Sequence, residues 1–217
     1  MMAALRSCHL PSSLPRSNLP TALEVRMPHT VSPPTHILAV FTSASSRPST
    51  AGDIAVLIPT HHTILAINCA HLPRLPLSRP QPRSTGTAAL PVIPLTVPSA
   101  EAFAPLHSFL VVHRLDEFLY TLLSIIPSQT FAAVRAGSSN SAANPLAHLS
   151  PAQFATYLAA SAKGDKMSAL MGLTRNVMNV WRNACALGIF DRDLWAALDF
   201  AWEAILGAMN LVATSKA

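Results

Sequence analysis

The fold class of this chain is predicted from one stretch, residues 165–214, which reads DKMSALMGLTRNVMNVWRNACALGIFDRDLWAALDFAWEAILGAMNLVAT. Its apolar residues recur at spacings of three and four, first from Met167 to Cys185 and again from Trp195 to Met209. Side chains at this spacing stack on one face of an α-helix. The stretch therefore predicts two amphipathic helices, and we expect their apolar stripes to bury all three tryptophans in one core, Trp181, Trp195 and Trp202.

The ends of both helices are marked by residues that favour helix termini. Asp165 and Asp191 suit the N-caps, because a carboxylate there accepts a hydrogen bond from a backbone N–H that has no partner inside the helix. Gly188 tolerates the left-handed conformation that follows many last turns. Only residues 188–190 connect the two patterns, so we predict that the helices fold back on each other as an αα-hairpin.

The sequence before this hairpin predicts further helices of the same domain. Residues 101–126 carry a broad apolar face, and a short helix is expected after them over residues 128–136. Ser150 and Gln153 form a capping-box signal around a proline at the first helical position. We therefore predict an all-α domain over residues 101–217, which is a small helical bundle or an αα-hairpin array.

The first hundred residues differ from the rest in composition. They hold fifteen of the nineteen prolines, and their seven arginines against two acids account for the whole net charge of +5. With Phe41 as their one aromatic residue, they are predicted to be largely disordered. Residues 1–35 form a basic leader whose scarcity of acids is typical of an organellar transit peptide, with an ordinary disordered terminus as the alternative.

Residues 36–100 are predicted to have little order, with short β-like runs embedded among prolines. Residues 54–67 are a candidate β-hairpin with its turn at residues 59–62, and two strands alone are marginal in water. The prolines that recur from Pro73 to Pro98 predict an extended linker, partly in the polyproline II conformation.

No catalytic constellation is present in the sequence. It contains no G-x-G-x-x-G, P-loop, G-x-S-x-G or H-E-x-x-H motif, so we expect binding rather than catalysis and assign no catalytic residue. His61, His62, Cys69 and His71 do not have zinc-site spacing, so they are interpreted as scattered loop residues, and no metal or cofactor is predicted. No run of 18 apolar residues free of charge occurs, which predicts no membrane span.

The polar side of residues 165–187 is expected to carry Arg175, Asn176, Asn179, Arg182 and Asn183, opposite the apolar stripe. Arginine and asparagine side chains suit contacts to phosphates and to the edges of single-stranded bases. The alternative is that this face is only hydrated or pairs with acids of the next helix. That alternative is favoured by the charge balance from residue 101 onward, with eight basic and eight acidic residues and so no basic excess.

Two segments resemble organellar helical-repeat proteins of the FAST-kinase-like, RAP-domain and octotricopeptide group. Residues 149–163 are similar to the first helix of such a repeat, and residues 177–198 to its helix, Leu-Gly turn and second helix. The resemblance spans about residues 149–213. It implies import into an organelle and contact with organellar RNA.

We therefore expect a non-catalytic helical binding protein that contacts organellar RNA or a ribonucleoprotein through Lys166, Arg175, Asn179 and Arg182. The alternative is a protein–protein interaction or assembly subunit whose partner covers an apolar helix face. An enzyme of unfamiliar type is a third alternative. The first interpretation places the protein in the mitochondrion or another organelle, and the others in the cytoplasm or nucleus.

Overall fold

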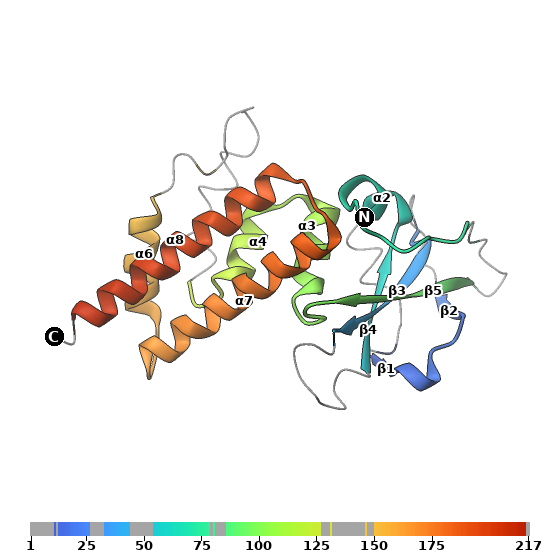
Figure 1. Cartoon of the computed structure of the whole chain (residues 1–217), viewed down its shortest axis with the longest axis horizontal. Helices are drawn as coiled ribbons and strands as arrows, with labels where there is room; N and C mark the ends of the chain where they lie inside the picture. Colours follow the sequence, from blue (N-terminus) through green and yellow to red (C-terminus); the bar gives the residue numbers. More distant parts are fainter. Residues whose placement is uncertain are drawn as a thin grey trace. The chain divides into compact units, whose positions relative to one another are not determined.

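The computed structural model describes residues 11, 13–26, 33–43, 54–78, 80, 86–126, 131, 146 and 150–215. The chain divides into two compact units, of which unit 1 comprises residues 1–112 and 182–190. Unit 2 comprises residues 113–181 and 191–217. Figure 1 shows the strands of unit 1 and the helices of both units.

Unit 1 is built on a curled, mixed sheet of five strands in the order β1-β4-β3-β5-β2. The central strand β3 pairs antiparallel with β4 and parallel with β5, and β1 and β2 are antiparallel edges. A short 3-10 helix η1 (Arg16–Asn18) follows the first strand, and helices α2 (His62–Asn68) and α3 (Phe103–Val112) also belong to this unit. The strands are β1 (Ser13–Pro15), β2 (Ala22–Arg26), β3 (His36–Thr42), β4 (Ile54–Thr60) and β5 (Thr87–Val97).

The prediction of an all-α fold behind a disordered front is wrong, because the front of the chain forms this sheet. Small and aliphatic side chains at alternate strand positions fill one core with a single aromatic ring, that of Phe41. The guanidinium carbon of Arg16 lies 3.9 Å from the centroid of that ring. The buried members of the core are Val25, Ile37, Ala39, Phe41, Ala55, Leu57, Ala88, Leu90 and Val92.

The predicted linker is wrong because β5 accommodates two prolines without losing a sheet hydrogen bond. Successive residues of a strand direct their N–H groups to opposite neighbours, and Val92 donates to the Thr21 carbonyl beside β2. Pro91 therefore directs its nitrogen toward β3, whose pairing with β5 begins only at Val92. Pro94 directs its nitrogen toward β2, whose pairing with β5 ends at Pro91. Each of these two proline nitrogens therefore faces a part of β5 that has no paired neighbour among the described strands.

Pro59 in β4 follows the same rule. The Thr60 carbonyl accepts the N–H of Thr35 beside β3, so Pro59 directs its nitrogen to the other side, toward β1. The pairing of β1 with β4 covers only residues 54–56. Prolines are confined in sheets to positions where no donor is needed, and this position meets that condition.

The predicted hairpin of residues 54–67 is also wrong. Its first half is β4, which pairs with β3 and β1, and its second half is the helix α2. The helix begins after His61, whose Nδ1 accepts the N–H of Thr63 at 3.3 Å, and it buries Ile64 and Leu65. A short apolar run does not distinguish a strand from one turn or two of helix.

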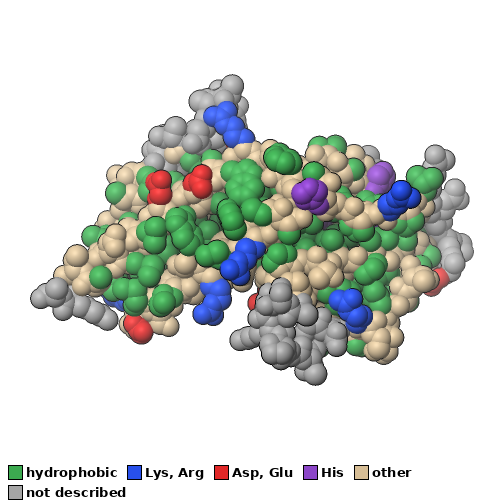
Figure 2. Space-filling model, in the orientation of Figure 1, with side chains coloured by type: hydrophobic (Ala, Val, Ile, Leu, Met, Phe, Trp, Pro, Cys, Tyr) green, Lys and Arg blue, Asp and Glu red, His purple; other side chains and the backbone are tan. Residues whose placement is uncertain are grey.

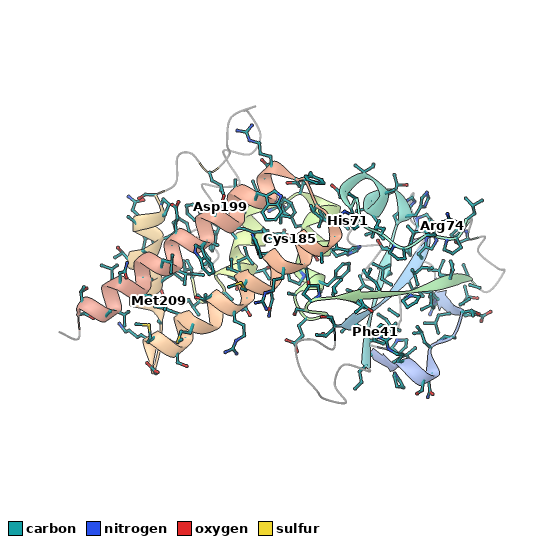
Figure 3. The ribbon with its side chains drawn as sticks, viewed as in Figure 1. Phe41, His71, Arg74, Cys185, Asp199 and Met209 are labelled. Carbon is teal, nitrogen blue, oxygen red and sulfur yellow. The ribbon has the colours of Figure 1, made fainter. Side chains whose placement is uncertain are left out.

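Unit 1 also contains the end of the long helix α7 (Lys166–Leu187) and the loop that follows it. Ala70 donates its N–H to the Gly188 carbonyl at 3.1 Å, and His71 donates to the Leu187 carbonyl at 2.9 Å. Gly188 has a φ of +63°, which confirms it as the residue that ends the helix. A Cβ there would lie 2.9 Å from Nδ1 of His71, a residue labelled in Figure 3.

We expect Gly188→Ala to destabilise the protein by about 1–2 kcal/mol, because alanine is strained in the left-handed region. The new methyl group would also displace the His71 ring. The matched control is Gly172→Ala within α7, where nothing lies within 4 Å of a new Cβ. That change should stabilise by about 0.5–1 kcal/mol through helix propensity. Urea unfolding of both variants checks the prediction, and equal effects would contradict it.

Unit 2 is helical and contains α4 (Leu115–Leu122), α6 (Pro151–Ser161), the greater part of α7, and α8 (Arg192–Thr214). Two predicted N-caps are confirmed. Ser150 Oγ accepts the N–H of Gln153 at 3.4 Å, and Asp191 Oδ1 accepts the N–H of Leu194 at 2.8 Å. The short helix predicted over residues 128–136 falls almost entirely outside the described residues.

The core of unit 2 forms around α8. Helix α6 approaches α8 closely at Gly207 of α8, where an added Cβ would lie 2.9 Å from the Cβ of Ala155 in α6. The rings of Phe154 and Phe200 meet edge to face with centroids 5.0 Å apart. Helix α7 runs antiparallel to α8, as predicted, and Thr174 Oγ1 lies 3.9 Å from the sulfur of Met209. Glycine thus lets two backbones approach where a larger residue would hold them apart.

The tryptophans do not share one dry core, so the predicted apolar stripe is wrong in its orientation. Trp181 is 46% exposed and Met171 is 55% exposed, and Trp195 and Trp202 are half-buried. The buried face of α7 in unit 2 is instead formed by Leu170, Leu173, Val177 and Val180. Apolar residues cover more than one side of this helix, and packing selected the aliphatic side.

Candidate functional site

The exposed Trp181 and the half-buried Trp202 line a groove between α7 and α8 in unit 2. We call this the tryptophan groove, and its volume is about 310 Å³. Figure 2 shows apolar side chains gathered over these two helices. Large apolar groups exposed together on a folded domain commonly mark a contact site for another molecule. The groove is lined by Val177, Met178, Trp181, Leu198, Asp199 and Trp202.

Charges of opposite sign border the tryptophan groove. On α8, Asp199 lines the groove and Glu203 follows one turn later, and both side chains are exposed. On α7, Arg175 is exposed beside Met171 and Met178, since residues three and four apart on a helix are neighbours. Figure 3 shows Asp199 on α8. The surface around the groove is therefore acidic on α8 and basic on α7, and Asp199 is the charged residue among those that line the groove itself.

The residues predicted to contact RNA are distributed along α7. Lys166 is its first residue and is exposed, as are Arg175 and Arg182, whereas Asn179 is half-buried. Arg182 belongs to the part of the helix that lies in unit 1. The structure does not test whether these four residues bind RNA.

Asn183 was placed on the polar side of α7, and this prediction is wrong because the residue is fully buried in unit 1. Its amide Nδ2 donates to the Ser99 carbonyl at 2.7 Å, and its Oδ1 accepts the Ser99 N–H at 2.9 Å. The side chain thus pairs with both backbone groups of one residue, as a neighbouring strand would. Asn183 therefore has a structural role: it holds the backbone of Ser99, which lies just before α3.

Three histidines cluster beside the sheet of unit 1. The ring centroid of His62 lies 4.9 Å from that of His61 and 6.0 Å from that of His36. The Pro76 carbonyl lies 2.8 Å from Nε2 of His36 and can only accept, so this nitrogen carries the hydrogen. In the neutral ring Nδ1 then accepts from the Thr35 hydroxyl, at 2.8 Å. Both nitrogens of His36 are used inside the protein.

Burial lowers the pKa of His36, and the nearby His62 lowers it further, although the bond to the Pro76 carbonyl raises it. Burial also lowers the pKa of His61, with His62 and His36 adding to the effect. Among the residues that the structure describes, no three His, Cys, Asp or Glu side chains form a group that could hold a metal ion. We interpret the cluster as a hydrogen-bond network that holds residues 35, 62 and 76 together.

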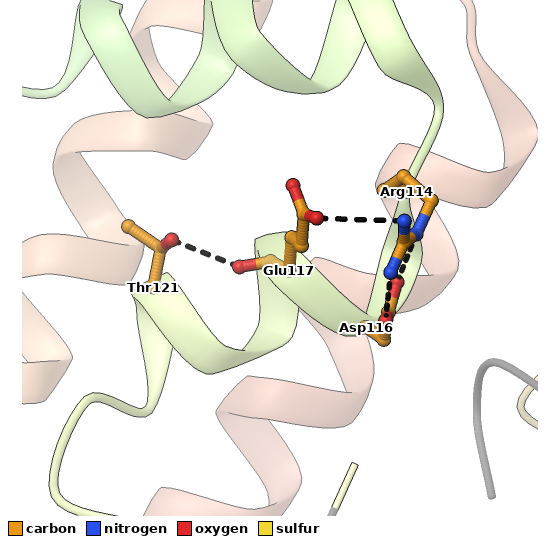
Figure 4. A network of polar contacts seen from close by, with 4 residues as sticks. All are labelled: Arg114, Asp116, Glu117 and Thr121. Carbon is orange, nitrogen blue, oxygen red and sulfur yellow. Dashed lines mark hydrogen bonds and ion pairs between the residues drawn. The ribbon is translucent and has the colours of Figure 1, made fainter. Parts of the chain in front are cut away.

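An ionic network of Arg114, Asp116 and Glu117 lies at the start of α4 in unit 2 (Figure 4). Arg114 contacts the two carboxylate oxygens of Asp116 at 2.8 and 2.6 Å, and one nitrogen lies 3.5 Å from Glu117. The hydrogen bond from Arg114 lowers the pKa of Asp116. The acids lie in the first turn of α4, where negative charge favours the helix. The arrangement has a structural explanation and suggests no chemistry.

Of the two described cysteines, Cys69 shows no sign of a reactive site. Burial raises the pKa of Cys69 to about 11, so its thiol stays protonated at neutral pH. Cys185 is exposed, and its predicted burial on the Trp181 stripe is wrong. A nucleophilic cysteine needs a depressed pKa, and Cys69 has the opposite shift.

One described helix, α8, is long and apolar enough to cross a membrane by length and composition alone. The same property is found in core helices of soluble proteins, and nine residues of α8 are buried in the structure. We attribute its apolar character to the core of unit 2.

Comparison with protein families gives a result for each half of the chain. Residues 1–98 match the model of the Clampless protein 1 N-terminal domain, and residues 116–217 match that of the Clampless protein 1 C-terminal domain. No curated protein and no solved structure matches the chain. The resemblance to organellar helical-repeat proteins is therefore wrong, and the predictions of a helical repeat, RNA binding and a mitochondrial location lose their support.

Proposed function

We propose that this chain, which carries the two Clampless protein 1 domains in order, is a protein-interaction subunit that docks an amphipathic helix of a protein partner in its tryptophan groove. The observation that carries the proposal is the exposure of Trp181 in an apolar groove that has Asp199 in its lining and Arg175 exposed nearby on α7. This was the alternative to RNA binding that the sequence left open.

The apolar character of the groove supports a protein partner. Trp181 in the groove, and Met171 and Leu206 elsewhere on the same two helices, are each more than two-fifths exposed. Tryptophan is among the residues that contribute most to protein–protein binding energy. An amphipathic helix can bury such residues by laying its apolar face into a groove between two others. A helix partner therefore fits the chemistry of the site.

The charges beside the groove determine which charges the docked helix should carry. Asp199 and Glu203 are exposed on the α8 side, so a docked helix should carry Lys or Arg along the flank that faces them. Complementary charge across an interface favours the correct partner and suppresses others. The partner is thus an amphipathic helix with an apolar stripe and one basic flank.

The test uses two synthetic helical peptides of about 18 residues, each with leucines at i, i+3, i+4 and i+7. One peptide has a lysine flank and the other a glutamate flank. We expect the lysine peptide to change the tryptophan fluorescence of the intact chain and to bind at least about tenfold more tightly than the glutamate peptide, which corresponds to about 1.4 kcal/mol.

The matched protein variants are Trp181→Ala in the groove and Tyr157→Ala on α6, whose side chains are 46% and 51% exposed. Titration calorimetry should show weaker peptide binding for the first and unchanged binding for the second, with circular dichroism confirming that both fold. Equal binding of the two peptides would contradict the proposal. So would partition of the intact chain into phosphatidylcholine vesicles that Trp181→Ala abolishes while peptide binding is absent.

A further inference from the structure

We infer, building on the proposed function, that the partner of the tryptophan groove is the same groove of a second copy of this chain, with α7 of each copy lying over α8 of the other. The two copies would be related by a two-fold axis that runs along the groove. Each copy then presents the same face to the other, so the interface is closed and no further copies add to it.

The outer face of α7 has the chemistry that the groove requires. Met171, Met178 and Trp181 lie along one side of the helix, with Arg175 beside them. The first two are seven residues apart and Trp181 follows three residues later, a spacing that keeps side chains on one helix face. This face is apolar with a basic flank, which matches the partner helix deduced from Asp199 and Glu203.

The charge pattern selects one symmetry. The surface around the groove is basic on α7 and acidic on α8. A two-fold axis across the groove would lay α7 of one copy over α7 of the other, so the basic side would meet the basic side and like charges would repel. An axis along the groove places α7 of one copy over α8 of the other, so the basic side meets the acidic side twice. Because α7 and α8 are antiparallel, the two stacked helices are antiparallel as well.

The register of α7 against α8 predicts which charges meet. Thr174 contacts Met209, and Trp181 lines the groove together with Leu198, so Arg175 lies at the level of about residue 206 of α8. An axis along the groove preserves this level. Measured along the helix axis, the level of Arg175 in one copy is then about one turn, roughly 5 Å, from the level of Glu203 in the second copy.

The experiment is sedimentation equilibrium of the full chain over roughly 1–100 μM, the range in which typical moderate complexes dissociate. We expect a monomer–dimer equilibrium that weakens with added salt, since exposed charge pairs are screened. Arg175→Glu and Glu203→Arg should each raise the dissociation constant at least about tenfold. The double variant should restore it to near the original value, because the pair is re-formed with its signs exchanged.

The control is Lys163→Glu, which reverses an exposed charge outside α7 and α8 and should leave the dissociation constant unchanged. If a single reversal fails to fold, cross-linking replaces it. In a Cys185→Ser background, chains with Arg175→Cys mixed with chains with Glu203→Cys should form the mixed disulfide dimer, and Arg175→Cys chains alone should not dimerise through that residue.

The outcomes separate this inference from the proposed function. A chain that stays monomeric throughout but still binds the lysine-flanked peptide overturns the second-copy inference and leaves the proposed function standing. A chain that does neither overturns both. A dimer that is insensitive to the single charge reversals, or one that the double variant does not restore, places its interface elsewhere and also overturns the inference.

Discussion

Replacing Asn183 with alanine is expected to destabilise the protein by roughly 2–6 kcal/mol, one of the largest effects of any single substitution in this chain. The change removes two hydrogen bonds and leaves the N–H and C=O of Ser99 without their partner inside the core. A buried polar group left unsatisfied costs about 1–3 kcal/mol. Native-state hydrogen exchange of the Ser99 amide, together with urea unfolding, measures the loss.

Two matched variants test the cause of that loss. Asn183→Asp keeps an acceptor for the Ser99 N–H and loses the donor to its carbonyl, so its effect should be at least as large because it also buries a charge. Asn176→Ala removes an exposed asparagine of the same helix and should change stability by no more than about 0.5 kcal/mol. A small effect of Asn183→Ala would show that Ser99 finds other partners, contrary to the structure.

Acidification from pH 6.5 to 4 is expected to cost about 3 kcal/mol of stability through His107 alone. Its ring is almost fully buried, with Nε2 2.9 Å from the Thr60 hydroxyl, and burial lowers its pKa to about 4. Above pH 6.5 the ring is neutral in both states and has no effect. Below that pH the unfolded chain takes up a proton that the folded chain does not, so stability falls by about 1.4 kcal/mol per pH unit until the folded pKa is reached.

The measurement is urea unfolding at pH values from 7 to 4, with His107→Gln as the comparison. Glutamine can still exchange a hydrogen bond with Thr60 and does not titrate. The lowered pKa values of His36 and His61 act in the same direction, so the variant should lose part of the pH dependence and keep the rest. An identical slope in both proteins would exclude His107 as the source, and a direct titration of its ring by NMR would show why.

Helix positions in the second half of the chain were predictable because their signals are local. Ser150 and Asp191 cap α6 and α8, and Gly188 ends α7, as the sequence indicated. A cap depends on a few neighbouring residues and their backbone groups. Tertiary contacts add little to where such a helix end forms, so the local sequence is sufficient to predict it.

The sheet was missed because strand pairing depends on residues far apart in the chain. Pro91 and Pro94 argue against a central strand when β5 is read alone. They are tolerated because β2 and β3 pair with different ends of β5, and their nitrogens face the unpaired parts. That staggered arrangement has no local signal. The composition of the first hundred residues was misleading for the same reason, since its core is aliphatic and assembled from all five strands.

The candidate site was in part predictable and in part not. The sequence indicated that α7 and α8 are amphipathic and antiparallel, and that an apolar helix face was one candidate contact surface. It did not indicate that Trp181 would lie outside the core while Asn183 lay inside it. Both residues occupy helix positions whose burial is set by what packs on each side.

What the sequence by itself determined is where helices begin and end in residues 150–214, because capping and helical periodicity act between residues within one or two turns. Tertiary structure decided the rest: that the proline-rich front is a sheet, that Asn183 pairs with Ser99, and that Trp181 and Trp202 border a groove. The physical reason is that hydrophobic burial is non-directional, and that strand pairing joins segments far apart in the sequence. Which apolar face is covered is therefore settled only when distant segments come together.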